Sequence, residues 1–417
     1  MAKIEMLTRG DGLRIFMKDC PFTNKVMVTI GTLAGSASDP PDKLGLFHFF
    51  EHMAFQGTVT KSAEQVAELL SRYCISYNAS TGKLSTQYYG TTNKRNFAKM
   101  FEILADIYAN STFPEKEFCK EREVIKNEIA MYKDKDGHLA FGNLARILYR
   151  ENPARQSALG TSESLDSINR ETLIRLHKEF YSWKNTFIIV SGRFEKDELL
   201  KLINSNFPVD FENVAPEKKS WSDESDDPLI KKIAVIEKPQ REKAIILLGC
   251  KTPANFPDKE QLILNLIANL LGQGGSSPLY SELRQKRGLV YSASTVIYDE
   301  RPLYQMMVFC AETLPKNISE VKKLMIKIAK SHPLEEAKFL EAKERMKDHY
   351  ECYPEGVGEW NQIIAGIIEL GEDVLLLNNF TETIWEILDS ITFADVLAMR
   401  KKYLTSKRLA FSIVKPV

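Results

Sequence analysis

The sequence has no excess of either charge. Lysine and arginine together number 56, as do aspartate and glutamate, so the formal net charge is zero. Proteins that bind nucleic acid or an anionic membrane surface through electrostatics usually carry a basic excess. No uninterrupted apolar run approaches the roughly 18 residues that a transmembrane helix needs. We therefore expect neither a nucleic-acid partner nor a membrane partner.

Cysteine is scarce and scattered. The six cysteines form no Cys-x-x-Cys pair, so in a chain of this length they indicate free thiols of a reducing compartment rather than a disulfide frame or a zinc knuckle. Residues 1–9 also lack the apolar core of a signal peptide. These two absences together predict a cytoplasmic protein.

The length predicts more than one domain. A chain of 417 residues exceeds what one hydrophobic core usually serves, and 44% hydrophobic with 27% charged residues is ordinary globular composition. Residues 207–228 contain prolines and a run of charged and small polar residues with little to bury, which is typical of a linker. We therefore predict domains at 1–206 and 229–417.

Strand-like and helix-like patterns follow one another in both halves. Alternating or β-branched runs predict strands, and apolar spacing of 3.6 residues predicts helices. Asp39-Pro40-Pro41-Asp42 can cap a helix that stops near Gly57, and Ser62 with Gln65 forms a capping box for the next helix. The predicted strands are 12–18, 25–32, 77–81, 86–90, 185–192, 230–237, 243–249, 289–298, 303–310 and 409–414. The predicted helices include 62–72, 97–108, 112–134, 144–149, 170–181, one from 195 and 257–271.

The most informative motif is His48-Phe49-Phe50-Glu51-His52, inside the apolar run 46–55. On a helix, His48 and His52 lie one above the other and can bind one metal ion together, and Glu51 reaches the same site without being a ligand. Two imidazole ligands and a base are the equipment of a zinc hydrolase, in the His-x-x-Glu-His order of the inverzincins. The alternative is a polar patch on a core helix. Since the chain has only six histidines, this spacing favours the metal site.

A zinc site of this kind needs a third protein ligand. In the predicted helix 112–134, Glu121, Ile125 and Glu128 share one face. Glu128 could ligate the metal, with Glu121 behind it. Glutamate-rich helices are more often solvated faces, and spacing alone does not bring Glu128 to His52.

A shift of 217 residues superposes the two halves. It places His48, Glu51 and His52 on Asn265, Ala268 and Asn269, and both segments continue into a Gln-Gly pair. This alignment predicts an internal repeat whose second copy keeps the helix and has lost the metal. Chance similarity is the alternative, because a helix followed by glycine is common.

Residues 45–58 resemble the His-x-x-Glu-His helix of the pitrilysin and insulysin metallopeptidase family. Its third ligand is a glutamate about 76 residues beyond the second histidine, in a pattern that Glu121-Arg-Glu-Val-Ile-Lys-Asn-Glu128-Ile matches here. The resemblance implies one Zn²⁺ per chain on His48, His52 and Glu128, with Glu51 as general base and Glu121 in support. Residues 158–167 resemble another block of the family. The segment Asn78-Ala79-Ser80-Thr81 resembles the edge strand that binds substrate as an added β-strand, and the resemblance implies substrate binding by Asn78, Ala79 and Ser80.

Residues 271–284 and 288–291 resemble the family's glycine-rich loop and Arg/Tyr pair. The resemblance implies that Arg284 and Tyr291 bind the peptide backbone near the scissile carbonyl, with Tyr291 helping to stabilise the oxyanion. A phosphate-binding loop is a weak alternative, because the chain has no Gly-x-x-x-x-Gly-Lys-[Ser/Thr] motif. A helix cap and a turn would explain the glycines but not Arg284 and Tyr291 together.

The length is similar to that of the two-domain branch, which includes mitochondrial processing peptidase and its bacterial relatives. The resemblance implies an α+β fold of two homologous domains, each a mostly antiparallel sheet packed with helices, that forms a clamshell on dimerisation. It implies a zinc endopeptidase that cleaves extended peptides in a chamber of two subunits, and we expect a homodimer in which each zinc site receives Arg284 and Tyr291 from the other subunit. The alternatives are a noncatalytic subunit of a heteromeric complex and a heterodimer with a related chain.

Overall fold

A computed structural model describes residues 3–210, 214–217, 219–254 and 258–417. Residues 211–213 and 218 of the predicted linker, and Pro257 of a predicted helix, lie outside this description. The chain forms two compact units. Unit 1 comprises Met1–Ala130, Gln156–Lys219 and Tyr353–Asn379, and unit 2 comprises Met131–Arg155, Ser220–Cys352 and Phe380–Val417.

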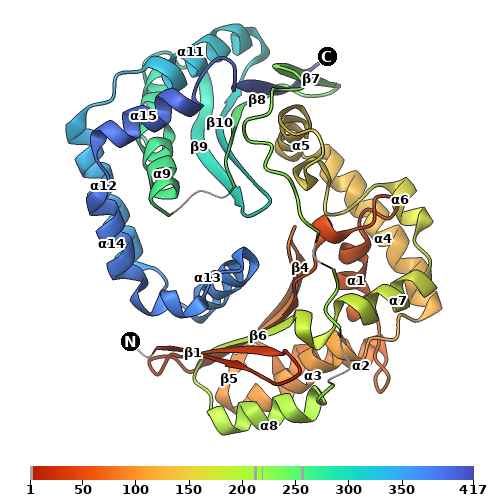
Figure 1. The fold of residues 1–417 in the computed structure, drawn as a ribbon. Helices are drawn as coiled ribbons and strands as arrows, with labels where there is room; N and C mark the ends of the chain where they lie inside the picture. The colour runs from red at the N-terminus through yellow and green to blue at the C-terminus, as the bar shows by residue number, and fades with distance from the viewer. Residues whose placement is uncertain (1–2, 211–213, 218, 255–257) are drawn as a thin grey trace. The chain divides into compact units, whose positions relative to one another are not determined.

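Unit 1 is built on a six-stranded sheet, of which Figure 1 labels β1, β4, β5 and β6. Its strand order is β1-β2-β6-β3-β5-β4. Only the β2–β6 pair is parallel. The central strand β6 is buried at every position, as expected for a β-branched run covered on both faces. The strands are β1 Ile4–Thr8, β2 Arg14–Asp19, β3 Lys25–Thr32, β4 Ser76–Thr81, β5 Thr86–Asn93 and β6 Thr186–Gly192.

Helices cover both faces of this sheet. Gly90 faces α3, where Met100 Sδ lies 3.0 Å from the position a Cβ would take. Val28 pairs with Gly90, and the next residue, Thr29, contacts Asn361 of α13 through a hydrogen bond of 2.9 Å, so α3 and α13 lie on opposite faces. The main helices of unit 1 are α1 Leu46–Ala54, α2 Ala63–Tyr73, α3 Phe97–Ala109, α6 Ser162–Ser167, α7 Arg170–Phe180, α8 Lys196–Asn206 and α13 Val357–Leu370, with most of α4 Glu115–Asp134.

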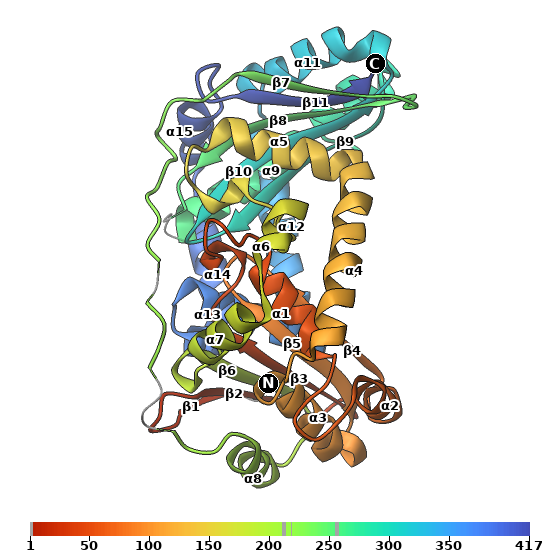
Figure 2. The ribbon, with the colours of Figure 1, turned by 90° about the vertical axis from the view of Figure 1, so that its right-hand side faces the viewer.

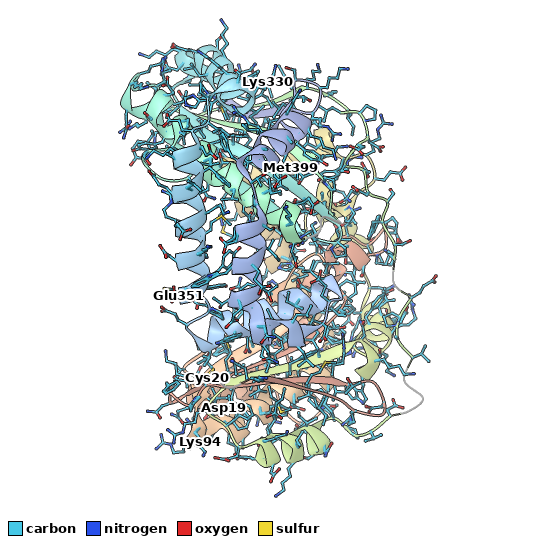
Figure 3. All side chains as sticks on the ribbon, turned by 60° about the vertical axis from the view of Figure 1, so that its left-hand side comes forward. Asp19, Cys20, Lys94, Lys330, Glu351 and Met399 are labelled. Carbon is cyan, nitrogen blue, oxygen red and sulfur yellow. The ribbon has the colours of Figure 1, made fainter. Side chains whose placement is uncertain are left out.

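Unit 2 has a five-stranded sheet in the order β7-β11-β8-β10-β9. Helix α5 packs on β7, β8 and β11 (Figure 2), and α9 lies in a core of leucine, isoleucine and methionine side chains with α12 and α15, the helices that carry the labelled Glu351 and Met399 in Figure 3. The strands are β7 Ile233–Lys238, β8 Ala244–Thr252, β9 Val290–Glu300, β10 Tyr304–Thr313 and β11 Ala410–Pro416. The main helices are α5 Asp136–Leu148, α9 Asp258–Gly272, α11 Ile318–Ser331, α12 Glu336–Cys352, α14 Phe380–Ser390 and α15 Phe393–Tyr403.

The two sheets share one topology. The order β2-β6-β3-β5-β4 in unit 1 corresponds to β7-β11-β8-β10-β9 in unit 2. In each case the first pair is parallel and the others are antiparallel. Helices α1 and α9 occupy the same place in the two connections. The predicted α+β fold with two homologous domains is therefore confirmed.

The two compact units do not coincide with the two halves of the chain, because each unit contains segments from both halves. Helix α5 comes from the first half of the chain and covers the sheet of unit 2, whereas α13 comes from the second half and covers the sheet of unit 1. The boundaries 1–206 and 229–417 stay a prediction about the homologous halves. The apolar face of an amphipathic helix predicts that the helix packs on a hydrophobic surface, but it does not predict which of two similar sheets provides that surface.

In the described part of the chain, no helix is both long enough and apolar enough to cross a membrane. All six cysteines are free thiols.

Candidate metal centre

Helix α1 begins at a backbone crossing that only glycine allows. Gly45, its N-cap, has φ 89°, and a Cβ there would lie 2.5 Å from the carbonyl oxygen of Leu159. In the segment that crosses it, a Cβ on Gly160 would lie 2.1 Å from the carbonyl oxygen of Leu44. The segment 158–167 therefore fixes the start of the motif helix.

Polar side chains secure the same end of the helix. The buried carboxylate of Asp39 accepts the backbone N–H groups of Gly45 at 2.7 Å and of Phe47 at 3.1 Å, which confirms that the Asp-Pro-Pro-Asp segment caps α1. Ser164 donates a hydrogen bond to the carbonyl of Leu44 at 2.7 Å. Burial raises the pKa of Asp39 to about 7 against the opposing effect of these two N–H groups.

Aromatic side chains fix the rotation of α1. Phe49 stacks on Phe118 of α4, with ring centroids 4.8 Å apart. Phe50 contacts His177 of α7 edge to face at 5.9 Å. These ring contacts hold α1 against α4 and α7, and Figure 2 shows α1 beside α4.

The histidines of α1 and a glutamate of α4 converge on one point. One ligand atom from each of His48, His52 and Glu128 lies within 4.8 Å of the other two. Glu128 Oε2 lies 3.7 Å from His48 Nε2 and 3.5 Å from His52 Nε2. Two imidazole nitrogens and one carboxylate oxygen are the donor set of a catalytic zinc site.

Glu121 orients the second histidine. His52 Nδ1 lies 3.0 Å from Glu121 Oε2, and Gln56 Nε2 donates to Glu121 Oε1 at 3.1 Å. Because a carboxylate only accepts, Nδ1 carries the proton and Nε2 keeps its lone pair for a metal. Glu121 is buried, so this support is rigid.

The pKa shifts of His48, Glu51 and His52 are compatible with a metal site. Burial, together with the neighbouring His52, lowers the pKa of His48 to about 3, so its imidazole is neutral at pH 7. Burial lowers the pKa of His52, but the hydrogen bond to Glu121 and the three nearby carboxylates outweigh it and raise the pKa overall. Burial raises the pKa of Glu51 against the opposing hydrogen bond from Thr81. A neutral His48 with an available lone pair suits a divalent metal ion.

Thr81 belongs to the predicted edge strand, but its contact with Glu51 was not predicted. Its hydroxyl donates a hydrogen bond of 2.6 Å to Glu51 Oε2. Thr81 is the last residue of strand β4. It lies 30 residues from Glu51 in the sequence. Nothing in the local pattern distinguishes it from any other strand threonine.

The predicted substrate strand is an edge of its sheet. Within the described residues β4 pairs with β5 alone. Asn78 and Ser80 are exposed and Ala79 is buried, as expected for alternating strand positions. The outer edge of β4 therefore has backbone groups available for a further strand.

Arg284 and Tyr291 come together in unit 2. Arg284 lies in the π-helical turn Ser281–Gln285 and donates to the carbonyl of Val290 at 2.9 Å. Its guanidinium lies 5.6 Å from the ring centroid of Tyr291, and Tyr291 is 65% exposed. The predicted pair is thus a real contact with an accessible phenol.

Comparisons with known proteins agree with this arrangement. The family model described as insulinase (peptidase family M16) matches residues 14–162, and the model described as peptidase M16 inactive domain matches residues 167–346. The uncharacterized zinc protease YmxG of Bacillus subtilis is 31% identical over 291 residues, covering 69% of each chain. An uncharacterized zinc protease of Rickettsia bellii is 26% identical over 408 residues, covering 95% of this chain and 94% of that protein. A protease from Helicobacter pylori has a similar fold, with a TM-score of 0.85 at 21% identity over the whole of both chains.

Proposed function

Because the chain belongs to the insulinase family of peptidases, family M16, we propose that it is a zinc-dependent endopeptidase. The observation that carries the proposal is the convergence of His48, His52 and Glu128. A base candidate, Glu51, lies on the same helix one turn after His48.

One Zn²⁺ per chain would bind to His48 Nε2, His52 Nε2 and a carboxylate oxygen of Glu128. Zinc, when bound, supplies Lewis-acid activation of a water and of the scissile carbonyl. Glu121 would keep His52 in the tautomer that leaves Nε2 free, through the hydrogen bond of 3.0 Å. Glu121 is therefore a positioning residue for the metal site.

Glu51 would act as general base on the attacking water and then give the proton to the leaving amine. Its raised pKa suits the first step, because a carboxylate with a raised pKa takes the proton from water more readily than an ordinary surface glutamate does. Thr81 holds Oε2 of this carboxylate, which limits its rotation.

The substrate would be an extended peptide that adds a strand to the free edge of β4, along Asn78, Ala79 and Ser80. Backbone hydrogen bonds give such binding little dependence on side-chain identity. Arg284 and Tyr291 would bind the peptide backbone near the scissile carbonyl, with Tyr291 donating to the oxyanion.

We propose a homodimer in which the partner subunit's Arg284 and the partner subunit's Tyr291 complete each zinc site. Each chain carries one metal-ligand set and one Arg/Tyr pair, so two-fold symmetry gives two equal composite sites. The six free thiols support a cytoplasmic location.

The test is metal analysis of the purified protein combined with cleavage of quenched peptides. We expect one zinc per chain and cleavage that a chelator abolishes. His48→Ala and Glu128→Gln should lose both the zinc and the activity. A folded protein with neither zinc nor cleavage would support the alternative, a noncatalytic subunit of a larger complex.

A further inference from the structure

The 217-residue shift extends well beyond helix α9. Applied to β3, β4 and β5 it gives 242–249, 293–298 and 303–310, which overlap β8, β9 and β10. Applied to α4 it gives 332–351, against α12 at Glu336–Cys352. Strands β3, β4 and β5 and helices α1 and α4 therefore have counterparts in unit 2 at this one offset.

The counterparts of Glu121 and Glu128 are basic residues. The shift takes Glu128 to Arg345 and Glu121 to Lys338, and it takes His52 to Asn269. Arginine has no lone pair to offer a metal and remains protonated. In unit 2, helix α12 thus carries a cation at each of the two positions where the corresponding helix α4 carries Glu121 and Glu128.

Arg345 and Asn269 still meet, as Glu128 and His52 do in unit 1. Arg345 Nη2 donates a hydrogen bond of 2.6 Å to Asn269 Oδ1. Both residues line a cavity of about 190 Å³ that also includes Lys338. A direct charged hydrogen bond joins α12 to α9 at the point where a metal would join α4 to α1.

Further hydrogen bonds connect Asn269 to the glycine-rich loop. Asn269 Nδ2 donates to Gln273 Oε1 at 3.2 Å, and the N–H of Gln273 donates to the carbonyl of Asn269 at 3.3 Å. Gln273 is the first residue after α9. Farther along, Gln285 Nε2 donates to the carbonyl of Gly275 at 3.2 Å and so connects the loop to the turn that carries Arg284.

We propose that Arg345 and Asn269 are positioning residues that hold the glycine-rich loop, residues 273–277, in its substrate-binding conformation, at the place of the former metal site. The pair acts through the loop on substrate binding by Arg284 and does not touch the reacting atoms. This proposal rests on the proposed peptidase function.

The chain offers a matched control in Lys338. It is on the same helix, lines the same cavity and carries the same charge as Arg345. Its ammonium pairs with Glu341 at 2.8 Å instead of with α9. A substitution there changes the charge of the cavity and leaves the link to Asn269 intact.

The experiment compares Arg345→Ala, Asn269→Ala and Lys338→Ala in the full-length zinc-loaded protein. Hydrogen exchange of residues 273–277 should become about tenfold faster in the first two variants, because a hydrogen bond to a charged donor is lost. KM for a quenched peptide should rise about tenfold with little change in kcat, whereas Lys338→Ala should match the wild type. Arg345→Lys, which keeps one donor, should recover part of the loss.

Two results would overturn the proposal: unchanged loop exchange in folded Arg345→Ala and Asn269→Ala proteins, or equal effects of Lys338→Ala and Arg345→Ala. Circular dichroism and zinc content verify folding in each variant. The exchange measurement needs no activity, so a wild-type protein without zinc-dependent cleavage would refute the proposed function and leave the loop result to be judged separately.

Discussion

His48, His52 and Glu128 lie together at the candidate metal centre, whereas the neighbouring Glu51 has a different hydrogen-bond partner. His48 and His52 direct Nε2 toward Glu128, whereas Glu51 is held by Thr81. The proposed base, Glu51, thus has a hydrogen-bond partner of its own, apart from the three proposed metal ligands. This division is what a single metal with an adjacent base requires.

Thr81→Val should lower kcat about tenfold with KM nearly unchanged. Valine has the same shape, but it removes the hydroxyl that fixes Glu51 Oε2, and a lost hydrogen bond to a charged group costs roughly 1.5–3 kcal/mol. Thr81→Ser keeps the hydroxyl and should stay close to the wild-type rate. Steady-state peptide cleavage measures both, and equal rates for the valine and serine variants would refute the role of Thr81.

The protein should lose stability in acid partly through His177. Burial of its imidazole lowers the pKa of His177 to about 4 from 6.5 against the hydrogen bond to the carbonyl of Tyr108. The unfolded chain takes up the proton below pH 6.5 and the folded chain only near pH 4, so stability is full above pH 6.5 and falls as pH decreases toward 4. The stability of the wild type relative to His177→Gln should fall by about 3 kcal/mol between pH 7 and pH 4. Urea unfolding at several pH values measures this, and parallel curves for the two proteins would contradict it.

At the residue scale, spacing alone predicted the face shared by His48 and His52, because helical geometry is local. The approach of Glu128 needed the family resemblance, since nothing in a sequence spacing of 76 residues specifies a tertiary contact. The contact of Thr81 with Glu51 was missed for the same reason. The hydrogen bond from a strand end to a helix depends on how the two elements pack.

Among the elements, α13 is the one whose position matters most to unit 1 and could least be predicted. Its Asn361 is buried, donates to Thr29 Oγ1 at 2.9 Å and accepts a hydrogen bond from Ser191. The local signals of α2 and β3 gave correct predictions. The capping box of Ser62 and Gln65 is present, and β3 occupies the predicted residues 25–32. By contrast, β1 was not predicted, since its five residues show no clear alternation.

Asn361→Ala should destabilise the protein by about 2 kcal/mol, because it leaves buried hydroxyls of β3 and β6 with fewer partners. Gln362→Ala, an exposed neighbour on the same helix, should change the unfolding free energy by less than about 0.5 kcal/mol. Chemical denaturation compares them. Equal effects would mean that the buried hydrogen bonds do not hold α13 on the sheet.

For the whole molecule, the internal repeat explains why the two halves of the chemistry lie in different units. Unit 1 has the metal ligands, and unit 2, with the same sheet topology, has Arg284 and Tyr291. Mixing Glu51→Gln subunits with Arg284→Ala subunits should give hybrid dimers with one doubly damaged and one intact site. After complete exchange, activity should return to about a quarter of the wild-type value. No recovery, with subunit exchange demonstrated by mass spectrometry, would exclude composite sites.

The proposed mechanism is tested most directly by the effect of Glu51→Gln on zinc content and peptide cleavage measured in the same preparation. Because Glu51 is proposed as the base and not as a ligand, we expect an unchanged content of one zinc per chain and a loss of cleavage of at least about a hundredfold, the usual contribution of a general base. A Glu51→Gln protein that still cleaves peptides at the wild-type rate with its zinc bound would contradict the assignment of Glu51 and the mechanism built on it.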